Sequence, residues 1–145
     1  MLVRDILSNK QIGKILSVET TDNVASAVAM LSEMRIGAVI VRDSGNELDG
    51  ILSERDIVRE LGRRGANCLN DKVAALMTSN VKTCSPVQTS QEVMQMMTDG
   101  RFRHMPVMDD GKLVGVVSIG DVVAARIKEV QFENDAMAEM FAGNI

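Results

Sequence analysis

The sequence has very few aromatic residues: three Phe, and neither Trp nor Tyr, among 145 residues. Proteins that bind single-stranded nucleic acid stack the bases on aromatic side chains, and this chain has almost none to offer. The formal net charge of −4 and the sequence pI near 5.0 also argue against a broad contact with a phosphate backbone. We therefore expect no nucleic-acid partner.

Cysteine, histidine and long apolar runs are also scarce. Cys68 and Cys84 lack metal-type and redox-type spacing, and Cys84 takes an apolar position of the repeat described below, so a buried free thiol is expected there. His104 is the only histidine, and it has no second ligand or nucleophile at a motif spacing, which argues against a metal site and a hydrolytic triad. No apolar run reaches the ~18–20 residues that a membrane span needs, and Arg4 and Asp5 break any signal peptide. We expect a cytoplasmic protein with no membrane partner.

What the sequence does contain is an internal repeat. Residues 50–58 (GILSERDIV) return as residues 115–123 (GVVSIGDVV), a shift of 65 positions, with the glycine, serine, aspartate and last valine identical. At a shift of 66 the match extends towards the N-terminus: Val18 falls on Cys84, Ala27 on Val93, Leu31 on Met97, Asp43 on Asp109 and Gly45 on Gly111. A constant register over this length indicates a duplicated supersecondary unit.

Each copy has the same pattern of expected elements. A short segment (15–18 or 81–84) precedes a helix, and in the first copy Val24, Ala27, Val28, Leu31 and Met34 follow a helical period. Two strands joined by a turn at 43–45 or 109–111 follow, at 38–41 and 48–52 or at 104–108 and 113–117, and a helix closes the unit. The sequence therefore predicts an α+β fold of two β-α-β-β-α repeats. We expect them to pack through their sheets with pseudo-twofold symmetry, because one small sheet alone would leave an apolar face in water.

The expected domain organisation follows from the repeat. The first repeat covers 1–64, a linker 65–72, the second repeat 73–128 and a helical extension 129–145, with Gly65 as a helix stop. In the extension and the helix before it, Val123, Ile127, Val130, Met137 and Phe141 form an apolar stripe with a seven-residue period. This stripe fits two alternatives: a helix folded back on its own domain, or a dimer contact.

The repeated Ser-x-x-Asp pattern allows two interpretations. Ser53 and Asp56, like Ser118 and Asp121, have the spacing of a capping box at a helix start. The same position is a seat for phosphate, because free N–H groups and the helix dipole favour an anion there. An aspartate one turn into the helix can accept hydrogen bonds from the two ribose hydroxyls, as an acid does in dinucleotide folds. Duplication of the whole pattern favours a nucleotide site over a cap alone.

From these residues, together with Arg103-His104-Met105-Pro106-Val107, the chain resembles a tandem cystathionine β-synthase (CBS) domain pair, also called a Bateman module. The resemblance covers about residues 3–127, and small stand-alone CBS-pair proteins look most similar. It implies a regulatory adenosine-nucleotide binder without catalytic activity. AMP is the first expectation, with ADP, ATP or NAD as other possible ligands and no metal required. It also implies a homodimer, as a disc of four repeats, and a regulated protein that the sequence does not identify.

The resemblance also implies roles for particular residues. Ser53 and Ser118 would contact phosphate, Asp56 and Asp121 would hold ribose, and Arg103 and His104 would bind phosphate. Their counterparts in the first copy, Gly37 and Ala38, are uncharged, so the copies are unequal. Because clefts in the family are built from both repeats, Arg103 and His104 could serve a nucleotide whose ribose lies on either aspartate. Arg55 could reach a phosphate or pair with Glu54 or Asp56. The base would lie against apolar side chains or backbone near Ile15, Val18, Val81, Thr83, Ile51, Leu52, Val116 and Val117.

Two other functions compete with ligand sensing. A structural or interaction protein would use both Ser-x-x-Asp pairs only as helix caps. A nucleotide hydrolase would need a general base and usually a metal, and the sequence repeats only one aspartate per motif.

Overall fold

The computed structural model describes residues 1–10 and 14–143, which form two compact units. Unit 1 comprises Met1–Gly13, Thr83–Asp110 and Val114–Ile145, and unit 2 comprises Lys14–Lys82 and Gly111–Leu113. Each unit thus combines most of one sequence repeat with the N-terminal segment of the other repeat.

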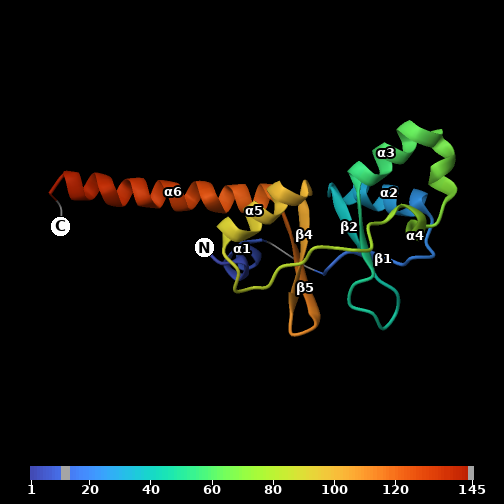
Figure 1. Ribbon diagram of the computed structural model, residues 1–145, viewed down its shortest axis with the longest axis horizontal. Coiled ribbons are helices and arrows are strands. Elements are labelled where there is room, and N and C mark those ends of the chain that lie inside the picture. The colour runs from blue at the N-terminus through green and yellow to red at the C-terminus, as the bar shows by residue number, and fades with distance from the viewer. Residues whose placement is uncertain (11–13, 144–145) are drawn as a thin grey trace. The chain divides into compact units, whose positions relative to one another are not determined.

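Unit 2 contains a three-stranded sheet covered by helices (Figure 1). Its elements are β1 (Ser17–Val18), α2 (Val24–Met34), β2 (Ala38–Val41), β3 (Gly50–Ser53), α3 (Glu54–Arg64), the 3₁₀ helix η1 (Gly65–Asn70) and α4 (Val73–Leu76). Strand β2 is central, parallel to β1 and antiparallel to β3. This is the β-α-β-β-α order expected from the sequence.

Unit 1 repeats the arrangement with a smaller sheet. Its elements are α1 (Val3–Asn9), α5 (Ser90–Gly100), β4 (His104–Asp109), β5 (Lys112–Ser118) and the long helix α6 (Ile119–Phe141). Strands β4 and β5 pair, and Cys84 takes the place of β1 through a parallel bridge to Val107. The α+β fold expected from the sequence is confirmed.

The short helices α1 and α4 occupy equivalent places in the two units. Each belongs by sequence to one repeat but packs in the unit formed mainly by the other repeat. The Val3 N–H donates to Gln88 O at 2.9 Å in unit 1, and the Val73 N–H donates to Asp22 O at 2.8 Å in unit 2. Gln88 and Asp22 are related by the 66-residue shift, so the two contacts are equivalent. The sequence did not reveal this exchange, which brings the N-terminal segment into the unit of the second repeat.

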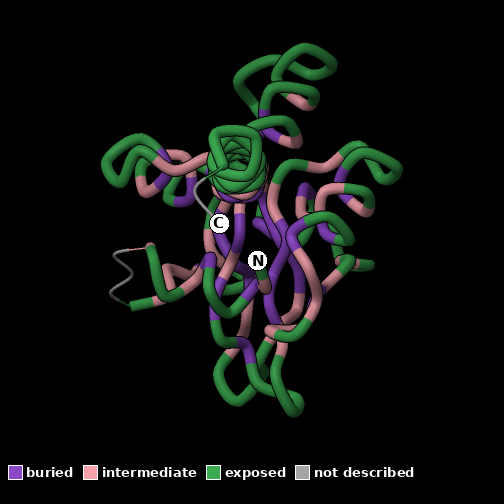
Figure 2. The backbone as a smooth tube through the Cα atoms, turned by 90° about the vertical axis from the view of Figure 1, so that its left-hand side faces the viewer, coloured by how far each residue is buried: buried purple, intermediate pink, exposed green. Residues whose placement is uncertain are grey.

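The core of each unit consists of aliphatic and methionine side chains, and the central strands are largely buried (Figure 2). In α2, Val24, Ala27 and Leu31 are buried as expected, but Met34 is 51% exposed, because it lies at the end of the helix, beyond the packed face. Cys68 and Cys84 are buried free thiols, which confirms the prediction for Cys84. Burial raises the pKa of the Cys84 thiol to about 11.

The repeated glycine of the nine-residue pattern has a steric reason in both units. A Cβ atom on Gly50 would lie 2.7 Å from Thr78 O, and one on Gly115 would lie 2.9 Å from Leu7 Cδ2. Both contacts come from the segments around α4 and α1, the exchanged helices. At Gly50 a Cβ would clash with backbone, whereas at Gly115 the Leu7 side chain would have to shift.

Residues 65–72, expected as a linker, continue unit 2 without a gap. Helix α3 ends at Gly65 (φ 75°), as predicted, and η1 follows. Arg64 donates to Glu60 at 2.7 Å and pairs with Asp71, which fastens the end of α3 to the end of η1. The hydrogen bond from Arg64 lowers the pKa of Glu60 below its ordinary value.

Helix α6 extends well past the repeat. Its first turns pack on unit 1 through Val122 and Ala125, and Ser90 donates to Glu129 at 2.7 Å. From Val130 to Gly143 every residue is exposed, and α6, seen end-on in Figure 2, is green at the end nearest the viewer. The extension therefore does not fold back on the described part of unit 1.

Candidate functional site

The site in unit 1 begins where β5 ends and α6 starts. Ser118 is the N-cap residue, and its hydroxyl accepts from the Asp121 N–H at 3.1 Å. In return the Ser118 N–H donates to Asp121 Oδ2 at 2.8 Å. The pair is a reciprocal capping box, which uses one of the two carboxylate oxygens.

Unit 2 holds the same arrangement at the start of α3. The Asp56 N–H donates to Ser53 Oγ at 3.3 Å, and the Ser53 N–H donates to Asp56 Oδ2 at 3.0 Å. The Ser53 hydroxyl also lies 3.0 Å from Asp56 Oδ2. Both motifs are therefore genuine caps, and the cap prediction is confirmed in each copy.

The residue that precedes the first strand of each hairpin is hydrogen-bonded to the first residue of the closing helix. The Ile119 N–H, at the first position of α6, donates to Arg103 O at 2.7 Å, and the Glu54 N–H donates to Gly37 O at 2.9 Å in unit 2. Arg103 and His104 therefore lie beside Ser118 at the N-terminus of α6, whereas the first copy has Gly37 and Ala38 there. Arg103 is exposed and His104 half-buried. Arg103 and His104, the pair expected to hold phosphate, thus belong to the helix start of unit 1, while Arg55 stands at the helix start of unit 2.

Lys10, which the sequence analysis missed, completes this site. Its ammonium group lies 2.7 Å from Asp121 Oδ2 and donates to Val116 O at 3.0 Å. Burial raises the pKa of Asp121, but the hydrogen bonds from Lys10 and Ser118 and the charge of Lys10 outweigh it, so the pKa lies below its ordinary value. Asp121 is therefore ionised at neutral pH, and its charge is already balanced by Lys10.

The two aspartates differ in their cationic neighbours. Asp56 pairs with Arg59, on the same helix, with 3.9 Å between Nη1 and Oδ1. Arg63 and Arg64 pair with Glu60, so this part of α3 is not a uniformly basic surface. Lys10 could not be found from the repeat, because it lies before the matched residues and reaches Asp121 only through the exchange of α1.

A small pocket of about 170 Å³ lies beside Asp121, between α1 and α6. Asn9, Lys10, Asp121 and Lys128 are its polar lining residues. Binding sites for drug-sized molecules usually measure ≈ 300–1,000 Å³. This pocket can therefore accommodate part of a nucleotide, such as a ribose or a phosphate, but not the whole molecule.

The residues expected around the base are less uniform. Leu52 and Val117 are fully buried in the cores of their units, and Val18 and Ile51 are 5% and 9% exposed. These four can offer a ligand little more than backbone groups. Half-buried side chains are Thr83 and Val116 in unit 1 and Ile15 and Val81 in unit 2, and Arg55 is exposed at the start of α3.

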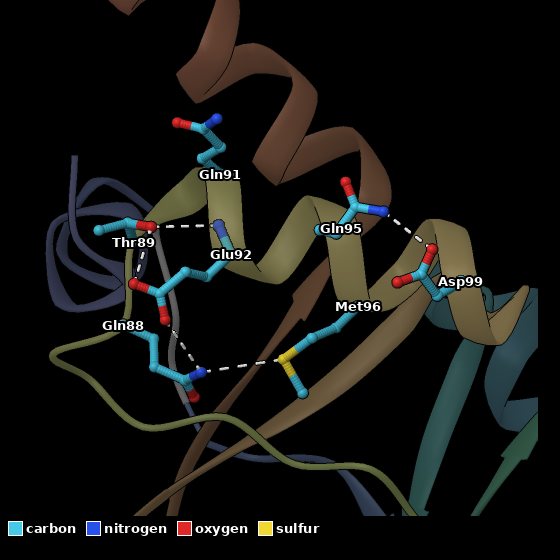
Figure 3. A pocket seen from close by; sticks show the side chains of 7 residues that line it. All are labelled: Gln88, Thr89, Gln91, Glu92, Gln95, Met96 and Asp99. Carbon is cyan, nitrogen blue, oxygen red and sulfur yellow. Dashed lines mark hydrogen bonds between the residues drawn. The ribbon is translucent and has the colours of Figure 1, made fainter.

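A larger groove of about 620 Å³ runs along α5 (Figure 3). Its polar side chains mostly bond to one another: Gln95 donates to Asp99 at 2.8 Å, and Thr89 donates to Glu92 at 3.2 Å. Two carboxylates and no cation line it. It is unsuited to a phosphate group and contains none of the predicted site residues.

Two further findings concern the residues described, 1–10 and 14–143. None of their helices combines the length and apolar character needed to cross a membrane. They contain no group of three or more His, Cys, Asp or Glu side chains arranged to hold a metal ion.

Comparison with known proteins agrees with the duplicated architecture. The family model for the CBS domain matches residues 3–63 and 73–128. The chain is 39% identical over 121 residues to the CBS domain-containing protein CBSX3, mitochondrial, of Arabidopsis thaliana, covering 81% of the chain and 59% of that relative. It therefore spans little more than half the length of that relative.

Solved structures show the same fold. A CBS-domain protein from Agrobacterium tumefaciens matches with a TM-score of 0.83 and 39% identity, over 87% of this chain and 99% of that one. The CBS domain pair of protein MJ0100, crystallised with 5′-methylthioadenosine and S-adenosyl-L-methionine, matches with a TM-score of 0.76. At 22% identity, over 89% of this chain and 98% of that one, this second likeness concerns the fold.

Proposed function

The chain belongs to the CBS domain family, and from that premise we propose that it is a regulatory module that binds an adenosine nucleotide and catalyses no reaction itself. AMP is the proposed ligand, with ADP, ATP and NAD as its competitors. The module works in the cytoplasm as a homodimer of four repeats and acts on a regulated protein, with no nucleic-acid or membrane partner.

The observation that carries the proposal is the grouping of Ser118, Asp121 and Arg103 at the N-terminus of α6. The helix start supplies N–H groups and a positive dipole end for phosphate, and Arg103 adds a cation. The cap uses Asp121 Oδ2, and a carboxylate has a second oxygen that can accept from a ribose hydroxyl. Adenosine compounds bound to a CBS pair of the same fold support the choice of ligand class.

The ion pair between Lys10 and Asp121 adds a free-energy cost to ribose binding. Asp121 Oδ1 is left for one ribose hydroxyl, but the second hydroxyl needs Oδ2, which lies 2.7 Å from the Lys10 ammonium group, so ribose competes with Lys10 for that oxygen. A displaced Lys10 ammonium would still belong to the pocket that Lys128 also lines, and there it could attract the phosphate. We therefore propose that unit 1 binds phosphorylated nucleotides in preference to nucleosides, and that its affinity exceeds that of unit 2.

The structural alternative rests on the capping boxes, which are complete without a ligand. It differs from the proposal in a measurable way, because a cap contributes stability but no ligand protection. Isothermal titration of the full chain with AMP, ADP, ATP, NAD and GMP tests this. Binding of an adenosine nucleotide with GMP inactive supports the proposal; no heat and no thermal shift with any of them at millimolar concentration refutes it.

The absence of catalysis is tested separately. Incubation with ATP and Mg²⁺, followed by chromatography of the products, should return unchanged ATP. Steady turnover that scales with protein concentration would overturn this part of the proposal and favour a nucleotide hydrolase.

A further inference from the structure

The exposed part of α6 carries a heptad pattern that the nucleotide site does not use. Val123, Ile127, Val130, Met137 and Phe141 are 40%, 53%, 44%, 54% and 85% exposed. Their spacings of four, three, seven and four residues place them at the a and d positions of a coiled coil, with Asn134 at the one a position left between them.

This segment needs a partner to be a stable helix. Glu129 is the last residue of α6 that is not exposed, so the following twelve residues, up to Phe141, lack packing within the described chain. Isolated helices of this length are marginal in water, and most helix stability in proteins comes from packing an apolar face. The apolar face available is the heptad stripe itself.

We propose that the α6 helices of two copies of this chain pair in parallel as a short two-stranded coiled coil through this stripe. The contact involves α6 alone, and none of its stripe residues lines the pocket beside Asp121.

Asn134 favours the parallel orientation over the antiparallel one. In a parallel pair the two Asn134 side chains face each other, and their amides can hydrogen-bond across the seam, the arrangement by which an a-position Asn fixes register in parallel dimers. In the fully overlapping antiparallel register, Asn134 would face Val130 of the second copy. Its buried amide would then have no polar side chain opposite, which is unfavourable.

The charged residues beside the seam also favour the parallel orientation. In the parallel pair Arg126 faces Gln131 of the second copy and Glu133 faces Ala138, so no like charges meet. The overlapping antiparallel pair would set the two Glu133 carboxylates side by side. A second copy in parallel therefore satisfies the apolar, amide and charged positions together.

Disulfide cross-linking of the full-length protein tests both contact and orientation. Met137→Cys, at a d position, should form a covalent dimer under mild oxidation, whereas the control Glu139→Cys, away from the seam, should not. The native Cys68 and Cys84 are buried, so the unmodified chain supplies the background. Equal cross-linking of the two variants refutes the seam. Cross-linking only between mixed Ile127→Cys and Met137→Cys chains refutes the parallel orientation.

Sedimentation equilibrium provides the second measurement. The double variant Val130→Glu/Met137→Glu places charges in the seam and should weaken self-association at least about tenfold. Phe132→Glu is the matched control, because Phe132 is 76% exposed on α6 but lies outside the seam. Circular dichroism checks that both variants remain folded. Equal effects of the double variant and the control would overturn the proposal, and so would no effect of the double variant; if the double variant unfolds, the cross-linking comparison decides.

Discussion

Replacing Lys10 tests whether its ion pair with Asp121 opposes ribose binding. Lys10→Met keeps most of the side chain but removes the ammonium group that lies 2.7 Å from Asp121 Oδ2. The two side chains are 34% and 22% exposed, so solvent screens the pair, and we discount its value to about 1 kcal/mol, the upper end for exposed pairs. If ribose must displace Lys10, this free energy returns to binding, and the affinity for adenosine should rise about fivefold.

Adenosine is the informative ligand because it has ribose and no phosphate. Calorimetric titration of adenosine into the wild-type chain, Lys10→Met and Lys128→Met measures the effect. Lys128 lines the same pocket, so its replacement removes an equal charge nearby without breaking the pair with Asp121. With AMP the gain in Lys10→Met should be smaller, since a cation near the phosphate is lost. Unchanged or weaker adenosine binding in Lys10→Met would refute the competition between lysine and ribose.

Three further predictions concern stability and reactivity. Cys84, whose pKa burial raises to about 11, should resist alkylation at pH 8 in the folded protein and react after unfolding in urea; rapid native reaction would contradict its placement. Gly50→Ala should lower the free energy of unfolding, measured in urea, by about 1–3 kcal/mol and by more than Gly115→Ala does. The new Cβ at residue 50 meets the backbone at Thr78, whereas the one at residue 115 meets the flexible Leu7 side chain. The reverse order would refute the steric reason. The pKa of Asp121 is lowered in the folded protein, so the stabilising contribution of its carboxylate is complete above the unfolded pKa of about 3.9 and is lost as pH falls through the folded pKa. Below about pH 4 the melting temperature of Asp121→Asn should therefore fall less than that of the wild type. Parallel curves of melting temperature against pH would contradict this.

The repeat allowed the fold to be predicted from the sequence. The helix period in 24–34 and the two hairpin turns gave the β-α-β-β-α order, and the shift of 66 transferred it to the second copy. Capping was also predictable, because Ser53 with Asp56 and Ser118 with Asp121 form local contacts three residues apart. Met34 was placed on the buried face wrongly, because periodicity does not tell where a helix extends past the side chains that cover it.

The exchange of α1 and α4 could not be predicted in the same way. It depends on long-range backbone bonds such as Val3 to Gln88, and nothing in the local pattern of residues 3–9 specifies that partner. Lys10 was missed for the same reason, since its contact with Asp121 spans most of the chain. The full burial of Leu52 and Val117 also depends on tertiary packing, which decides the face of a strand that a ligand can reach.

The central claim is that Ser118 and Asp121 form a nucleotide seat as well as a helix cap. Calorimetric titration of AMP into Asp121→Asn tests it most directly, because asparagine keeps an oxygen for the Ser118 N–H but loses the carboxylate charge. Thr89→Ala is the control: Thr89 caps α5 by accepting from the Glu92 N–H at 3.1 Å, and its loss should cost about 0.5–2 kcal/mol of stability without changing affinity. We predict that Asp121→Asn weakens AMP binding at least about tenfold and that Asp56→Asn weakens it less. Wild-type affinity for AMP in Asp121→Asn would contradict the account and leave the motif as a cap alone.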